Sequence, residues 1–286
     1  IYVAQDQGGI SRINRSNYQV NWITEFWASD GSQKVLGRIK KIAVVPERKF
    51  MFLVDTEATD AIRAIDISDD DSLIYVHDFT GGTGNIKDLD GFTIVDVPFA
   101  QGTYKMVCAY CGSNSFRYDY YDGTIFNNNV FTVSPGIASG FKLTDNYIYV
   151  TAEQLGLYIY DRNDRHLVGK IHLNGEAQKV ELCGNVAYVA SRQSGLHTVD
   201  VYNPAAPVLL STFDTSGYAT SLAISGNKLA VSSGGGGVYL FDISIPSQPK
   251  LIQHLTSCGY TNTVKFMDDR LVVGARDQGI LIYKIR

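Results

Sequence analysis

Polar side chains that suit ligand recognition recur in this sequence directly after short apolar runs. These residues are Glu153, Arg192, Gln193, Arg276 and Gln278. Two tyrosines, Tyr218 and Tyr260, stand at a second kind of position, after a glycine and before the next β-rich segment. Carboxylate, guanidinium, amide and phenol groups together could hold a sugar, a peptide or a partner protein. We therefore treat these seven residues as candidate binding residues, with ordinary hydrophilic turns as the alternative.

Linear signatures of catalysis are absent from the sequence. It contains no G-x-S-x-G elbow, P-loop, dinucleotide-binding fingerprint or H-E-x-x-H motif, and its five histidines are scattered. We therefore assign no catalytic residue and expect no cofactor. A hydrolase or lyase site built from Arg192, Arg276 and Glu153 stays open, because no linear motif would reveal it.

Metal ligation and disulfide bonding are both weakly indicated. Asp88 and Asp90 offer oxygen ligands but lack the spacing of a calcium loop, so we predict no metal site. Cys108 and Cys111 form a single C-x-x-C pair without a second pair or a nearby histidine. Residues three apart in a strand point to opposite faces, so a disulfide between them would need a local turn. The favoured interpretation of the four cysteines is free thiols.

A repeated pattern surrounds the candidate residues. The stretch NVAYVASRQSGLHTVDV has near copies in NKLAVSSGGGGVYLFDI and DRLVVGARDQGILIYKI. The residue that starts the second apolar run recurs at Ile10, Ile62, Phe116, Leu157, Leu196, Val238 and Ile280. Repeats of about 40 residues with four short β segments are typical of propeller blades, and the period-two alternation excludes helical repeats. We predict an all-β fold in which residues 1–286 form a single seven-bladed β-propeller domain of four-stranded antiparallel blades.

The pattern also predicts strands, turns and loops. The copy near Tyr218 predicts strands over 219–225, 227–233, 237–243 and 249–255. An aspartate ends the third strand of several copies, where we expect it to accept hydrogen bonds from the following turn: Asp66, Asp119, Asp161, Asp200 and Asp242. The longer second and third copies predict extra loops over 29–37 and 81–90.

The two ends of the chain supply fewer strands than complete blades need. IYVA, GISRIN and YQVNWITEF align with second, third and outer strands, so the first blade lacks its innermost strand. The last blade lacks its outer strand. Unpaired backbone groups cost about 1 to 3 kcal/mol each when buried. We therefore expect residues upstream of Ile1, or another chain, to fill the inner position, which would suit self-assembly into fibres or a surface layer.

The repeat resembles that of a known family. The string GNVAYVASRQSGLHTVDVYNPAAP follows the pattern of the LVIVD repeat. The match is good in the copies at Tyr147, Tyr188, Ala230 and Val272. The resemblance implies a β-propeller, an extracellular or cell-surface location as in most members, and no catalytic motif shared by the family.

Composition narrows the possible partners. The formal net charge is -4 and the lysines and arginines are dispersed, so we expect no nucleic-acid binding. No apolar run approaches the roughly 18 residues of a membrane-spanning helix. One glycosylation sequon begins at Asn14.

These observations favour a non-enzymatic, extracellular or cell-surface propeller that acts as a binding, adhesion or structural assembly module for a protein or glycan partner. In a propeller, the turns after the second strands and those between blades lie on one face, at the mouth of the central channel. All seven candidate residues fall on turns of these two kinds. Two alternatives stay open: a hydrolase or lyase with its active site at that mouth, and an intracellular interaction scaffold with free thiols.

Overall fold

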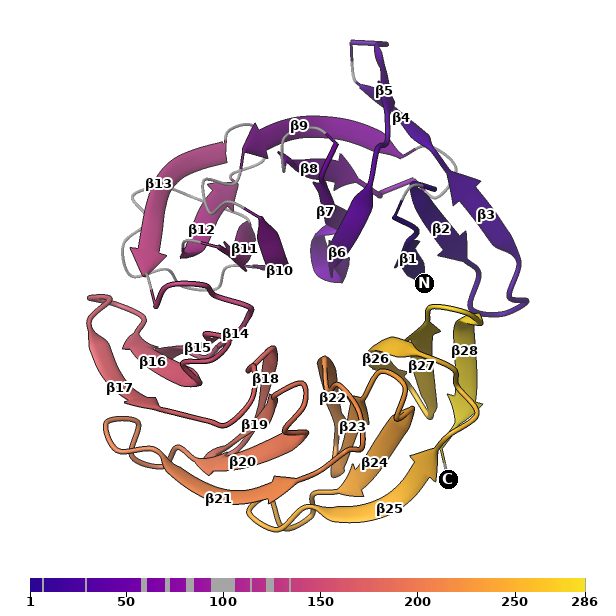
Figure 1. The fold of residues 1–286 in the computed structure, drawn as a ribbon. Coiled ribbons are helices and arrows are strands. Elements are labelled where there is room, and N and C mark those ends of the chain that lie inside the picture. The colour runs from indigo at the N-terminus through magenta and orange to yellow at the C-terminus, as the bar shows by residue number, and fades with distance from the viewer. Residues whose placement is uncertain are drawn as a thin grey trace. The chain divides into compact units, whose positions relative to one another are not determined.

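The fold is a seven-bladed β-propeller (Figure 1). The computed structural model describes residues 1–6, 8–28, 30–57, 61–69, 73–80, 85–93, 106–113, 115–121, 126–133 and 135–285. Within these ranges the helical structure is the three-residue 3-10 turn η1 (Pro46–Arg48), and no helix is long and apolar enough to cross a bilayer. The predictions of an all-β class and of seven blades are confirmed.

One compact unit, Pro135–Arg286, contains four blades whose strands pair in chain order. The fourth blade has strands β14 (Gly140–Leu143), β15 (Tyr147–Thr151), β16 (Leu157–Asp161) and β17 (Leu167–Ile171). The fifth has β18 (Lys179–Cys183), β19 (Val186–Ala190), β20 (Leu196–Asp200) and β21 (Val208–Phe213). The sixth has β22 (Ser221–Ser225), β23 (Lys228–Ser232), β24 (Val238–Asp242) and β25 (Lys250–Leu255), close to the predicted bounds. The seventh has β26 (Thr261–Met267), β27 (Arg270–Ala275) and β28 (Gly279–Lys284).

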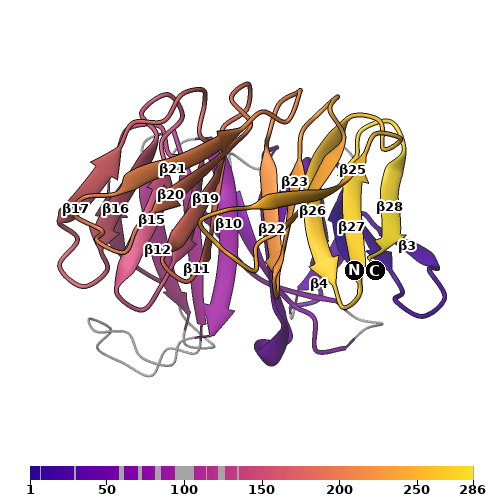
Figure 2. The ribbon, with the colours of Figure 1, turned by 90° about the horizontal axis from the view of Figure 1, so that it is seen from below.

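Within this unit the strands take regular radial positions. The first strand of each sheet lies innermost, and β17, β21 and β25 run along the outside (Figures 1 and 2). The inner strands β14, β18, β22 and β26 are neighbours in that order. Equivalent residues of successive blades therefore stand side by side.

The other compact unit, Ile1–Ser134, contains three sheets. The first has β1 (Tyr2–Ala4), β2 (Ile10–Ile13) and β3 (Val20–Ile23). The second has β6 (Ile39–Val45), β7 (Phe50–Asp55), β8 (Ala61–Asp66) and β9 (Ile74–Thr80), extended by β4 (Glu25–Ala28) and β5 (Gln33–Val35). The third has β10 (Ile86–Thr93), β11 (Met106–Gly112), β12 (Phe116–Tyr121) and β13 (Phe126–Val133).

The β4–β5 hairpin departs from the prediction. The expected single outer strand ends at Ile23, and β4 instead pairs in parallel with β9. The cause is Phe26, which is buried with Leu36 and Ile39 in the core of the second sheet. The predicted loop over 29–37 is therefore wrong where β5 forms, although Ser29 lies outside the described residues. Of the predicted loop over 81–90, residues 81–84 also lie outside them, and residues 86–90 belong to β10.

The first and last sheets each have three strands, as the strand count predicts. In the first sheet, β1 is the end strand and pairs with β2 in the antiparallel register Val3↔Ser11. In the last sheet, β28 is the end strand and pairs with β27. An inner fourth strand is therefore missing from the first sheet as described.

The core lies between neighbouring sheets. Between the fifth and sixth blades, Tyr188 packs with Leu229 and Phe241. All five residues of β19 are buried, because this strand lies between two strands of its own sheet and faces a neighbouring sheet. The Tyr188 phenol also donates a hydrogen bond to the carbonyl oxygen of Pro246 at 2.7 Å, which ties the sixth blade to the fifth.

The aspartates that end the third strands behave as predicted in four cases. Their Oδ1 atoms accept a hydrogen bond from the backbone N–H two residues later, at 2.6 to 2.8 Å, in Asp66, Asp161, Asp200 and Asp242. The prediction is wrong for Asp119, which is buried inside β12. Its Oδ2 accepts a hydrogen bond from the Tyr110 phenol at 2.6 Å.

All four cysteines are free, as the favoured interpretation predicts, and Cys108, Cys111 and Cys258 are buried. Cys108 and Cys111 belong to one uninterrupted strand, β11, so their side chains leave opposite faces of the sheet. Burial raises the pKa of the Cys108 thiol well above its ordinary value, which makes it unreactive.

Candidate functional site

The turns after the second strands carry a charged residue at one equivalent position in three of the four blades from the fourth to the seventh. The residues at this position are Glu153, Arg192, Gly234 and Arg276. Backbone hydrogen bonds tie three of these turns to the start of the next blade, through the isolated bridges Glu153↔Ala177, Arg192↔Ala219 and Gly234↔Thr261. The turns therefore hold their side chains at the junctions between blades.

In two of these turns, a charged residue adopts a backbone conformation that glycine would adopt at a lower free-energy cost. Glu153 and Arg192 have φ angles of 37° and 36°, in the left-handed region, and Gly234 has the same kind of conformation with a φ of 51°. A residue with a side chain costs about 1 to 2 kcal/mol there. Such strain at an exposed turn is typical of binding sites, where the side chain itself is needed.

The Arg192 side chain bridges two blades. Its Nη1 atom lies 2.6 Å from the Glu176 carboxylate, which belongs to the start of its own blade. Its guanidinium also lies over the ring of Tyr218, 5.3 Å from the centroid, at the start of the next blade. Tyr218 is 46% exposed, so the phenol remains open to a partner.

A second arginine–tyrosine pair follows on the seventh blade. The Arg276 guanidinium lies 5.0 Å from the centroid of the Tyr260 ring. The Tyr260 ring covers Gly234, where a Cβ atom would stand 3.0 Å from the ring. Gly234 is therefore the residue that lets Tyr260 lie flat against the turn.

These contacts define a surface that we call the Arg–Tyr face. It consists of Glu176, Arg192, Tyr218, Tyr260 and Arg276. Four of the seven predicted residues thus form two stacked pairs. Gln193 and Gln278 are exposed on the same turns, and Gln278 lies beside Gly259. Glu153 occupies the equivalent turn of the fourth blade, outside the two pairs.

Sequence reasoning missed Glu176, which neutralises Arg192. A signal was present, because Gly175-Glu176-Ala177 aligns with Gly217-Tyr218-Ala219. The Arg–Tyr face offers guanidinium donors stacked on exposed aromatic surface. This combination is enriched among the residues that dominate protein interfaces.

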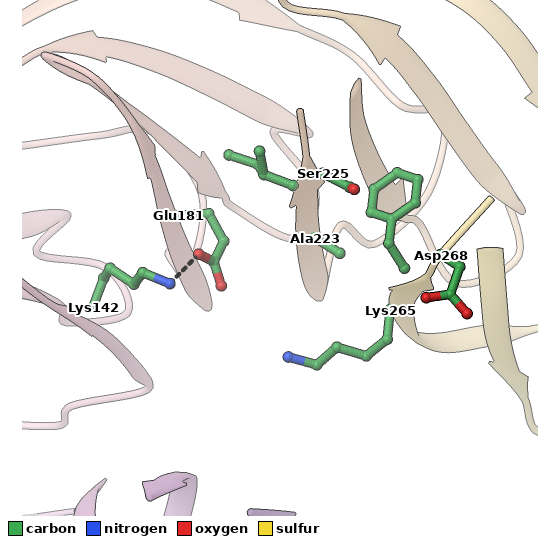
Figure 3. Close-up of a pocket in the computed structure, with 8 residues that line it drawn as sticks. Lys142, Glu181, Ala223, Ser225, Lys265 and Asp268 are labelled. Atoms are coloured by element: carbon green, nitrogen blue, oxygen red, sulfur yellow. Dashed lines mark ion pairs between the residues drawn. The ribbon is translucent and has the colours of Figure 1, made fainter. Parts of the chain in front are cut away.

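A pocket lies at the opposite end of the inner strands of the same unit (Figure 3). It has a volume of about 310 Å³. Lys142 and Glu181 form an ion pair across two inner strands, at 2.6 Å. The other lining residues are Ala223, Ile224, Ser225, Lys265, Phe266 and Asp268. Its charged lining residues comprise two lysines and two acids, so no ligand charge is favoured.

One group of side chains has the chemistry of a metal site. Asp161, Asp164 and His166 bring their ligand atoms within 4.8 Å of one another in the turn after β16. These atoms already have partners, because Asp161 accepts two backbone N–H groups and Asp164 contacts the His166 ring. Asp164 and His166 are exposed, and we assign the group no metal.

Comparisons with known proteins agree with the fold. The LVIVD repeat family matches residues 174–215 and 216–256. None of the curated proteins matches the sequence. The β-propeller domain of Cps50 (Swd1) from Myceliophteria thermophila is 10% identical with a TM-score of 0.71, covering 100% of this chain and 93% of that one.

Two further solved structures are similar over almost the whole chain. A chain of the mitotic checkpoint complex is 12% identical with a TM-score of 0.71, covering 99% of this chain and 83% of its own. The computationally designed Ika8 protein is 14% identical with a TM-score of 0.66, covering 99% and 92%. At these identities the likeness concerns the fold alone.

Proposed function

Because this chain is an LVIVD-repeat β-propeller, we propose that it is a non-enzymatic binding module of the cell surface or extracellular space that holds a protein partner on the Arg–Tyr face. The observation that carries the proposal is the pair of arginine–tyrosine stacks, Arg192 on Tyr218 and Arg276 on Tyr260. Both lie on turns that are tied to neighbouring strands by backbone hydrogen bonds. A partner would therefore meet side chains that are already ordered.

The stacks suit a protein partner with an acidic or carbonyl-rich surface. Stacking on tyrosine holds each guanidinium plane and leaves its N–H groups for acceptors. Glu176 neutralises Arg192, whereas Arg276 has no ion pair with any residue that the structure describes. We expect Arg276 to bind a partner carboxylate, while Tyr218 supplies apolar contact and a phenol. A glycan partner is the alternative, since tyrosines and amides also bind sugars.

Variants of the Arg–Tyr face test this proposal. The probes are a displayed peptide library and a glycan array, each screened against the purified chain. For a selected peptide, Tyr218→Ala and Arg276→Ala should each weaken binding at least about tenfold, as expected for central interface residues. Binding is measured by titration calorimetry, and thermal melting confirms that each variant is folded.

The matched control is Tyr202→Ala, because Tyr202 is 77% exposed on a turn after a third strand, away from the mouth turns. Its affinity should stay within about twofold of the wild-type value. Wild-type affinity in both Arg–Tyr variants would contradict the proposal. Binders from the glycan array alone would replace the protein partner by a sugar.

The proposed location rests on Asn14. Asn14 is exposed, and its side-chain Oδ1 accepts hydrogen bonds from the backbone and hydroxyl of Ser16, so the sequon lies in an accessible turn. In a eukaryotic secretory host, the wild-type chain should gain a glycan that glycosidase removes, and Asn14→Gln should not. The four free cysteines favour the alternative of an intracellular scaffold. A chain that stays unglycosylated during secretion would remove this support for an extracellular location.

Self-assembly through an added strand is part of the same proposal. The strand β1 ends its sheet, and a strand from another chain could extend that sheet by main-chain hydrogen bonds. Such addition would bury β1 without using the Arg–Tyr face. Light scattering of Leu209→Lys distinguishes this added strand from a contact through β21, because only the second contact uses residue 209.

A further inference from the structure

The outer strand of the fifth blade exposes a run of apolar side chains. Val208 is 56% exposed, Leu209 43% and Leu210 41%. They lie on β21, which follows the outside of its unit (Figures 1 and 2). Contiguous exposed apolar surface usually marks an interaction site.

A loop of the next blade adds to this surface. Ile245 is 60% exposed and precedes Pro246, whose carbonyl oxygen accepts the hydrogen bond from Tyr188. Tyr188 is the cross-strand partner of Thr198, which is in turn the partner of Ser211 in β21. The loop that contains Ile245 therefore contacts the blade to which β21 belongs. We call Val208, Leu209, Leu210 and Ile245 the rim patch.

The β21 edge lacks the charge that protects its neighbours. Outer strands of sheets usually carry lysine, which prevents pairing with other strands. The equivalent strands β17 and β25 carry Lys170 and Lys250, whereas residues 201–213 contain no charged residue. All three strands have a bulge, so it is the missing charge and not the bulge that distinguishes β21 from β17 and β25.

We propose that the rim patch is the contact between two copies of this chain, with β21 of one copy antiparallel to β21 of the other. A twofold contact brings the patch against itself, so apolar side chains meet apolar side chains. No like charges face each other across the strand, which would otherwise oppose pairing. An anionic membrane surface fits less well, because the flanking charges, Asp200 and Asp214, are acidic.

The test is the mass of the purified chain by light scattering after gel filtration, from about 1 to 200 μM. The wild-type mass should rise from one chain toward two across this range. Leu209→Lys should weaken the association at least tenfold, because it places one cation from each copy in an otherwise apolar contact. Hydrogen exchange provides a second measurement, since amides 208–213 should gain protection as the concentration rises.

The matched control is Leu251→Lys. Leu251 is 38% exposed and has the equivalent position on β25, where it pairs with Phe241 as Leu209 pairs with Val199. The self-association affinity of the Leu251→Lys variant should differ less than twofold from that of the wild type. The proposal is overturned if the wild-type chain stays a monomer at 200 μM, or if both variants weaken association equally. An association that Leu209→Lys leaves intact would also overturn it, and β1 would then be the contact to examine.

Discussion

Replacing Gly195 by alanine is expected to lower the free energy of unfolding by about 2 to 5 kcal/mol. Gly195 stands directly before the third strand of the fifth blade with a φ of 76°, and a Cβ there would stand 2.2 Å from the carbonyl oxygen of Phe213. The left-handed conformation costs an alanine about 1 to 2 kcal/mol, and forcing the strands apart adds about 1 to 3 kcal/mol. Chemical denaturation monitored by circular dichroism measures the loss.

The control for this substitution lies in the same blade. Gly184 also has a positive φ, of 57°, but a Cβ there would meet nothing within 4 Å. Gly184→Ala should therefore cost only the backbone term, about 1 to 2 kcal/mol. Equal losses of unfolding free energy in the two variants would show that the backbone at Phe213 shifts to accommodate the added Cβ at little cost. The same close approach recurs at Gly156 and Gly237, against the carbonyl oxygens of Ile171 and Leu255.

This glycine explains why so much of the fold could be predicted from the sequence. The fourth, fifth and sixth blades repeat one local arrangement, in which a glycine stands directly before the third strand and an aspartate such as Asp200 or Asp242 ends it. Both features act over a few residues or between adjacent strands. The strand pattern of the fourth to seventh blades was therefore readable without knowledge of any distant contact.

The candidate site was predictable in part for the same reason. Arg192 and Arg276 hold equivalent turn positions, and Tyr218 and Tyr260 hold equivalent starts of blades, so the repeat placed them on one face. Their pairing was not predictable. Arg192 stacks on the tyrosine of the following blade, whereas Arg276 stacks on the tyrosine of its own. Which tyrosine each arginine contacts depends on the directions of the side chains, and the repeat pattern does not predict those directions.

The sequence-based predictions that failed share one physical cause, which is contact between residues of different strands. The strand β4 pairs with β9 of the second sheet, and not within the first sheet, because Phe26 is buried in the core of the second sheet. The ion pair of Lys142 and Glu181 joins two inner strands that belong to different blades. Asp119 resembles a turn aspartate in the sequence, yet its buried carboxyl group accepts a hydrogen bond from Tyr110 of the adjacent strand.

Asp119 should make the protein less stable as the pH rises from about 4 to 7. Burial, as the main cause, raises the pKa of Asp119 to about 6, and the hydrogen bond from Tyr110 and the charge of Arg117 offset this only in part. A carboxyl group whose pKa is raised by folding binds its proton more tightly in the folded state. Its stabilising contribution is therefore complete below the unfolded pKa of 3.8 and is lost as the pH passes through about 6. A shift of about two pH units corresponds to a loss of about 3 kcal/mol.

The substitution Asp119→Asn isolates this effect. An asparagine keeps an oxygen for the Tyr110 hydroxyl but carries no charge to bury, so the variant should unfold less readily than the wild type at pH 7. The measurement is the difference in unfolding free energy between variant and wild type at several pH values, which cancels the titration of all other groups. This difference should change by about 3 kcal/mol between pH 4 and 7, in favour of the variant.

Asp242→Asn is the control of opposite sign. Hydrogen bonds from Ser244 lower the pKa of Asp242, so its carboxylate stabilises the fold above that pKa and ceases to do so in acid. The Asp242 variant should therefore lose a little stability at neutral pH, where the Asp119 variant gains. A difference for Asp119→Asn that stays constant from pH 4 to 7 would mean that Asp119 titrates normally. The buried hydrogen bond with Tyr110 would then be strong enough to hold the charged carboxylate inside the sheet.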